Sequence, residues 1–170
     1  MDAAKGEIII LGMGNKFFGD DGVGIVIAEK LKEHLTDFPQ ITVEETNWGG
    51  FRIIDLLSGY KSAIIIDALT TGKQPAGYIH QLDYKDLINS VRMVSFHDVN
   101  FATAVEFARE IRIPMPEEIS VYAIEIEKSD YFSERLTKDV VDSVHRCVQM
   151  IVGEITSRYG IELKHHEEIR

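Results

Sequence analysis

The chain has 170 residues, of which 45% are hydrophobic and 27% charged, and its formal net charge is −10 at pH 7. This length and composition are typical of a globular protein with one core, so we expect a single domain over residues 1–170 with a polar tail from about residue 160. The acidic charge disfavours nucleic acid and anionic membranes as partners, because phosphate binding needs a basic stripe that this sequence lacks. No apolar run approaches the roughly 18 residues of a membrane span. The lone Cys147, which we expect to be a small core residue, excludes an internal disulfide and favours a cytoplasmic protein. The acidic charge is compatible with a monomer, which is the oligomeric state we expect.

The first half of the chain alternates predicted strands and helices. Residues 7–12 (EIIILG) form a continuous apolar, β-branched run, which is typical of a strand buried on both faces of a parallel sheet. Apolar residues then recur at three- and four-residue steps, and this period predicts a helix over residues 21–34 with acidic residues at its start. Residues 41–45 (ITVEE) predict a second strand, residues 47–57 a glycine-containing turn and a short helix, and residues 63–67 (AIIID) another buried strand.

The second half continues this alternation with one weaker strand. Residues 78–82 alternate weakly after a turn-rich stretch, so we expect them to return antiparallel at an edge of the sheet. The segment Ser95-Phe96-His97-Asp98 has the serine and the acid of a capping box and predicts a helix with His97 in its first turn. Residues 119–126 predict the last strand and residues 136–155 a long amphipathic helix. The order of elements indicates an α/β fold with three layers, α/β/α, and a mainly parallel, about five-stranded mixed sheet.

Polar residues follow the predicted strands at the edge where open α/β sheets carry their sites. Asp20 and Asp21 follow the first strand, Asp67 ends the strand at residues 63–67, and His97 begins a later helix. Two carboxylates and an imidazole suit a divalent transition metal such as nickel or zinc, and the same groups suit general acid and base catalysis.

Each of these residues also has a structural interpretation. Asp20 and Asp21 are suited to capping the following helix, and helical spacing does not choose between them as ligands. His97 is equally suited to a hydrogen bond with a neighbouring loop. Asp67 is the residue that most favours function, because a carboxylate at the end of an aliphatic strand is costly to bury unless it is bonded or coordinating.

The glycines after the first strand invite comparison with a dinucleotide-binding turn. Gly12 and Gly14 have the GxG spacing, but the third glycine of GxGxxG would fall at Phe17. The chain has no GK[ST] phosphate loop, and two acids at the helix start would repel a phosphate. A nucleotide-binding domain is therefore the weakest of the functions that this fold class suggests.

Taken together, four segments resemble the hydrogenase maturation protease family. They are Gly12-x-Gly14-Asn15, Asp20-Asp21-Gly22-x-Gly24, Ile65-Ile66-Asp67-Ala68 and Ser95-x-His97-Asp98. Their order and spacing match the family pattern over about residues 6–158. The resemblance implies a cytoplasmic endopeptidase that removes the C-terminal extension of a nickel-iron hydrogenase large subunit after nickel has been inserted.

The resemblance also implies roles for three residues. Asp21, Asp67 and His97 match the metal-contacting and catalytic set of the family, although the first position is often glutamate there and is aspartate here. The nickel would arrive in the precursor of the large subunit, which is the expected partner, and no organic cofactor is implied. The family's usual glycine- and proline-containing segment is missing around residues 124–138, in loops that would shape the substrate groove.

Two functions other than an endopeptidase are compatible with the same resemblance. A nickel-binding assembly or delivery module would use the same three ligands without cleaving a bond. An inactive or chaperone-like homologue would keep the fold without the chemistry. The absence of a serine-nucleophile elbow and of HExxH agrees with a peptidase of unusual type.

Overall fold

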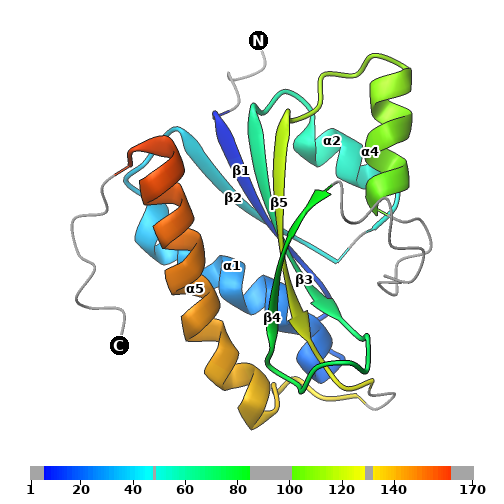
Figure 1. Cartoon of the computed structure of the whole chain (residues 1–170), viewed down its shortest axis with the longest axis vertical. Coiled ribbons are helices and arrows are strands. Elements are labelled where there is room, and N and C mark those ends of the chain that lie inside the picture. The colour runs from blue at the N-terminus through cyan, green and yellow to red at the C-terminus, as the bar shows by residue number, and fades with distance from the viewer. Residues whose placement is uncertain (1–5, 48, 85–100, 129–131, 162–170) are drawn as a thin grey trace.

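A single five-stranded sheet organises the chain (Figure 1). The computed structural model describes residues 6–47, 49–84, 101–128 and 132–161. Its strands are β1 (Ile8–Met13), β2 (Ile41–Thr46), β3 (Ser62–Leu69), β4 (Ile79–Asp83) and β5 (Glu118–Glu125). They lie in the order β2-β1-β3-β5-β4, and only β4 is antiparallel to its neighbour. The carboxyl ends of the four parallel strands therefore meet at one edge of the sheet.

Helices cover both faces of this sheet, as Figure 1 shows. They are α1 (Val23–Leu35), α2 (Arg52–Leu57), α4 (Phe101–Glu110) and α5 (Lys138–Tyr159), with a short 3-10 helix η1 (Gly19–Gly22) before α1. Ile8 and Ile10 point to the face under α1 and α5, whereas Ile9 and Leu11 point to the face under α2 and α4. The expected three-layer α/β/α fold with a mainly parallel sheet is confirmed.

Most predicted elements are present with small shifts at their ends. The antiparallel edge strand β4 is confirmed, and Cys147 is fully buried in the core. The helix expected to begin at Asp21 begins only at Val23, because Asp21 lies in η1, where its N–H donates to the carbonyl of Phe18 three residues back. The predicted capping box at residues 95–98 lies outside the described residues. In the described part of the chain, no helix is both long and apolar enough to cross a membrane.

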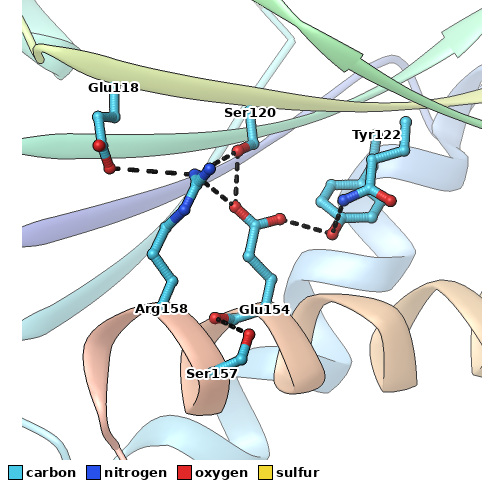
Figure 2. A network of polar contacts seen from close by, with 7 residues as sticks. Glu118, Ser120, Tyr122, Glu154, Ser157 and Arg158 are labelled. Carbon is cyan, nitrogen blue, oxygen red and sulfur yellow. Dashed lines mark hydrogen bonds and ion pairs between the residues drawn. The ribbon is translucent and has the colours of Figure 1, made fainter.

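The polar side of α5 is fixed to the amino-terminal half of β5 by a hydrogen-bonded network (Figure 2). The Glu154 carboxylate accepts hydrogen bonds from the hydroxyls of Ser120 and Tyr122, each at 2.6 Å, and from Arg158 at 3.0 Å. Arg158 also lies 4.0 Å from Glu118 at the start of β5. Glu118 and Ser120 lie at the start of β5, away from the strand ends that carry the candidate site, so the network holds α5 against the sheet.

The amino-terminal turn of α1 lies unusually close to the sheet. A Cβ added to Gly24 would be 2.3 Å from the carbonyl oxygen of Met13 and 2.4 Å from that of Ile66. A Cβ added to Gly12 would be 2.4 Å from the carbonyl oxygen of Gly24. All three contacts are with backbone oxygen atoms, which cannot move aside as a flexible side chain could. The two glycines thus allow α1 to approach β1 and β3 directly.

We predict that Gly24→Ala destabilises the fold by roughly 3 kcal/mol or more, because the new methyl group must displace either the helix or two strands. The matched control is Gly153→Ala in α5, where a Cβ would meet nothing within 4 Å. That change should raise stability by about 0.5 to 1 kcal/mol, since alanine favours the helix. Urea denaturation of both variants measures the difference, and equal stabilities would contradict the close approach.

Candidate functional site

Asp67 lies near the carboxyl end of β3, opposite Ala123 of β5. Its side chain is partly buried, and one carboxylate oxygen accepts a hydrogen bond from the N–H of Ala68 at 2.8 Å. Burial raises the pKa of Asp67 to about 7, and the negative charge of Asp21 adds to this rise, while the Ala68 hydrogen bond opposes it. Asp67 is therefore a carboxyl group that exchanges its proton near neutral pH.

Asp21 is brought towards Asp67 by the loop that follows β1. The N–H of Asn15 donates to the carbonyl of Asp21 at 3.3 Å, which closes this loop. Gly14 has a φ of 142°, and a Cβ there would be 2.0 Å from the same carbonyl oxygen. Only glycine fits such a position. The strand β3 contacts η1 directly, so the carboxylates of Asp21 and Asp67 share the same edge of the sheet.

The neighbouring Asp20 has a different environment. It is buried, and its two carboxylate oxygens accept hydrogen bonds from the backbone N–H and the hydroxyl of Thr137, at 2.6 and 2.8 Å. Thr137 occupies the N-cap position of α5. Asp20 thus joins η1 to the last helix. The two neighbouring aspartates have different environments: the Asp20 carboxylate is bonded to Thr137, whereas the charge of Asp21 raises the pKa of Asp67.

The third predicted site residue, His97, lies outside the described residues. Among the residues that the structure does describe, no group of three His, Cys, Asp or Glu side chains is arranged to hold a metal ion. Of the three predicted site residues, the structure describes two, the carboxylates Asp21 and Asp67. Two carboxylates are suitable oxygen ligands for a divalent cation, and a nearby imidazole would complete a set that suits nickel or zinc.

Sequence reasoning missed a further carboxylate at this edge. Glu125 ends β5 and is buried, and its oxygens accept hydrogen bonds from the backbone N–H groups of Thr71 and Gly72, at 2.7 and 2.9 Å. His80 contacts it at 2.9 Å, and these partners hold the pKa of Glu125 below its usual range despite burial. Glu125 therefore fixes the loop after β3, and His80 has a structural role as one of its partners. The sequence signal that could have identified Glu125 is the one that identified Asp67, namely an acidic residue at the end of an aliphatic strand.

Comparison with known proteins identifies the chain's relatives. Residues 25–154 match the model of the hydrogenase maturation protease family, and this match spans more than half of the chain. The chain belongs to this family. The matched region of this hydrogenase maturation protease includes Asp67 and His97, whereas Asp20 and Asp21 precede it.

Individual relatives agree with the family assignment. A protein of Methanocaldococcus jannaschii, assigned by its name to the hydrogenase maturation proteases, is 27% identical over 157 residues, which cover 89% of this chain and 97% of the relative. The hydrogenase maturating endopeptidase HybD of Escherichia coli has a TM-score of 0.72 at 19% identity, over 89% of this chain and 93% of its own. The maturation protease HycI of Thermococcus kodakarensis has a TM-score of 0.69 at 19% identity, over 88% and 92%. These structures share the fold of this hydrogenase maturation protease.

We predict that the Asp20 and Thr137 side chains act as one unit. Asp20→Ala should destabilise the protein by roughly 1.5 to 3 kcal/mol, because it removes a charged acceptor from two hydrogen bonds. Thr137→Ala should cost about 0.5 to 1.5 kcal/mol, since the backbone bond remains. In the double variant the two losses should not add, with a coupling of about 1 kcal/mol measured by urea denaturation. Strict additivity would show that the bond between them contributes nothing.

We also predict that Asp67 limits stability at high pH. The folded state binds the Asp67 proton more tightly than the unfolded state, because the pKa is about 7 when folded against a model value of 3.8. Stability is therefore lost as pH rises from about 4 to about 7. The asparagine of Asp67→Asn cannot ionise. The variant should therefore be more stable than the unchanged protein at pH 8, by up to roughly 4 kcal/mol, and this gain in stability should be absent at pH 4.

Thermal melting at pH 4, 6 and 8, with a chelator present to remove metal ions, measures this effect. Asp37→Asn is the matched control, because Asp37 is exposed in the turn after α1. It should leave the pH dependence unchanged. An Asp67→Asn variant whose melting temperature follows that of the unchanged protein at every pH would contradict the prediction.

Proposed function

We propose that this hydrogenase maturation protease is the cytoplasmic endopeptidase that removes the C-terminal extension of a nickel-iron hydrogenase large-subunit precursor after nickel insertion. The observation that carries the proposal is the convergence of Asp21 and Asp67 at the carboxyl edge of the sheet. Membership of the family supplies the class of reaction, and the carboxylate pair supplies the place where a nickel-loaded substrate would be recognised.

The electrostatics of the pair give a physical reason for dependence on nickel. Burial and mutual repulsion keep a proton on Asp67 near neutral pH when no cation is present. A divalent cation favours the ionised forms of both carboxylates, because its charge offsets the burial and the repulsion. Nickel carried in the precursor would thus stabilise the complex, while a nickel-free precursor would lack this contribution.

In this proposal nickel is part of the substrate. Asp21, Asp67 and His97 complete its coordination, with two oxygen ligands and one imidazole nitrogen supplied by this chain. The place of His97 in this set is proposed from its sequence motif alone. Contact with the metal fixes the position of the adjoining C-terminal segment, so that the scissile peptide bond lies beside the same carboxylates. Positioning of this kind converts hydrolysis into a reaction of a bound, oriented peptide.

The test is to incubate the purified protein with the unprocessed large subunit from the same source, in nickel-loaded and nickel-free forms. Mass spectrometry should show loss of a C-terminal peptide only from the nickel-loaded form. Asp67→Ala and His97→Ala should each reduce the rate by about 100-fold or more, since each removes a group that contacts the reacting complex. Gly153→Ala, in the exposed face of α5, is the control and should cleave at the normal rate.

Two results would count against the proposal. Cleavage of the nickel-free form at the same rate would show that the carboxylate pair does not sense the metal. Nickel binding through Asp67 and His97 without any shortening of the precursor would favour a nickel-binding assembly or delivery module instead.

A further inference from the structure

A group of exposed phenylalanine rings lies beside the candidate site. Phe17, Phe18 and Phe132 are 53%, 45% and 69% exposed, and we call them the aromatic patch. The rings of Phe17 and Phe132 are stacked, with centroids 5.7 Å apart and planes 18° apart. Large exposed apolar patches of this kind commonly mark surfaces that bind another protein, since leaving three rings in water is unfavourable.

The aromatic patch is held in place by the backbone. Its rings come from two loops that are far apart in sequence and are joined by hydrogen bonds, from the N–H of Ser133 to the carbonyl of Phe17 at 3.0 Å and from the N–H of Gly19 to the carbonyl of Ser133 at 2.5 Å. The first of these loops continues directly into η1, which carries Asp21. The aromatic patch is therefore linked to Asp21 by a short stretch of hydrogen-bonded backbone.

An acidic pocket adjoins the aromatic patch. It has a volume of about 660 Å³, and Phe17, Lys16, Glu45 and Glu134 line it together with other residues. The Lys16 ammonium is engaged by both oxygens of Glu29, at 2.7 and 2.9 Å. In the described part of the chain no ion pair engages Glu45 or Glu134. The charge that the pocket offers to a ligand is thus negative.

We propose that the aromatic patch and the acidic pocket form one docking surface for the protein substrate. Its occupant is an extended segment of the precursor that presents a large apolar side chain to the rings and a basic side chain to Glu45 and Glu134. This inference rests on the proposed function and adds to it the part of this chain that captures the substrate.

Charge favours such a substrate over a second copy of this chain. The whole protein has a formal net charge of −10, so two copies meeting at this surface would bring acidic groups together. A basic and apolar segment meets complementary groups at both parts of the surface. Aromatic residues are enriched in protein interfaces, whose rim is polar, so exposed rings beside charged groups suit a binding surface.

The experiment compares three double variants with the unchanged protein. Phe17→Ala/Phe132→Ala removes the stacked rings, and Glu45→Gln/Glu134→Gln removes the charges. Phe51→Ala/Phe107→Ala is the matched control, because these rings are also exposed, at 53% and 43%, and also in contact, at 5.2 Å, but lie at α2 and α4. Thermal melting confirms that each variant is folded.

Equilibrium binding of the nickel-loaded precursor is measured by biolayer interferometry, and cleavage is measured as KM and kcat. The Phe17/Phe132 variant should raise Kd and KM by about tenfold or more, as loss of an aromatic anchor usually does. The Glu45/Glu134 variant should raise both by roughly three- to tenfold and should weaken their dependence on salt. The control variant should stay within about twofold of the unchanged protein.

The outcomes separate this inference from the proposed function. If the unchanged protein binds the precursor without cleaving it, the peptidase proposal fails, and the Kd values still decide the docking surface. If the protein cleaves but the Phe17/Phe132 and Glu45/Glu134 variants keep their Kd and KM, the docking surface is overturned. Equal losses in the control variant would also overturn it. A dimer of the unchanged protein, seen by light scattering, would also overturn it if Phe17→Ala/Phe132→Ala dissociates that dimer without changing the Kd for the precursor.

Discussion

The close approach of α1 to the sheet is the constraint on which the site depends. Gly12 and Gly24 let the helix backbone lie against the carbonyl groups of β1 and β3, and Gly14 lets the loop between them fold back onto Asp21. Any side chain at these positions would move the start of the helix away from the strand ends. The electrostatic effect of Asp21 on Asp67 is therefore a consequence of backbone packing, because no direct bond between the two side chains is required to bring them together.

The acidic residues at this edge show how the local environment gives chemically similar carboxyl groups different pKa values. Asp67 lies near the end of β3 and is partly buried, whereas Glu125 ends the neighbouring strand β5 and is buried. Glu125 accepts hydrogen bonds from two backbone N–H groups and a hydroxyl and contacts His80, so its pKa is lowered. Asp67 accepts only a single bond from Ala68 among those described, so its pKa is raised. The satisfied carboxylate fixes a loop, while the less satisfied one remains available to a cation or a proton.

The same edge is also where the chain joins its distant parts. Asp20 connects η1 to the start of α5, Glu125 holds the loop after β3, and the loop of Phe17 pairs with that of Ser133. These connections surround the carboxylate pair with segments whose positions are mutually dependent. A protein substrate that contacts the outer loops would therefore meet carboxylates at a fixed distance. Such preorganisation favours recognition of one geometry over others.

Apolar periodicity and glycine spacing are local signals, so they were enough to predict the fold class, the order of the strands along the chain, the antiparallel edge strand and the family. The sequence also singled out Asp67, since an acid that ends an aliphatic strand is visible in one segment. Only the tertiary structure separated Asp20 from Asp21, because the partner of Asp20 is Thr137, 117 positions away. It alone revealed that Glu125 is a buried, satisfied acid and that Phe17 and Phe132 are stacked. Contacts between segments so distant in sequence depend on how the elements pack, which no local pattern records.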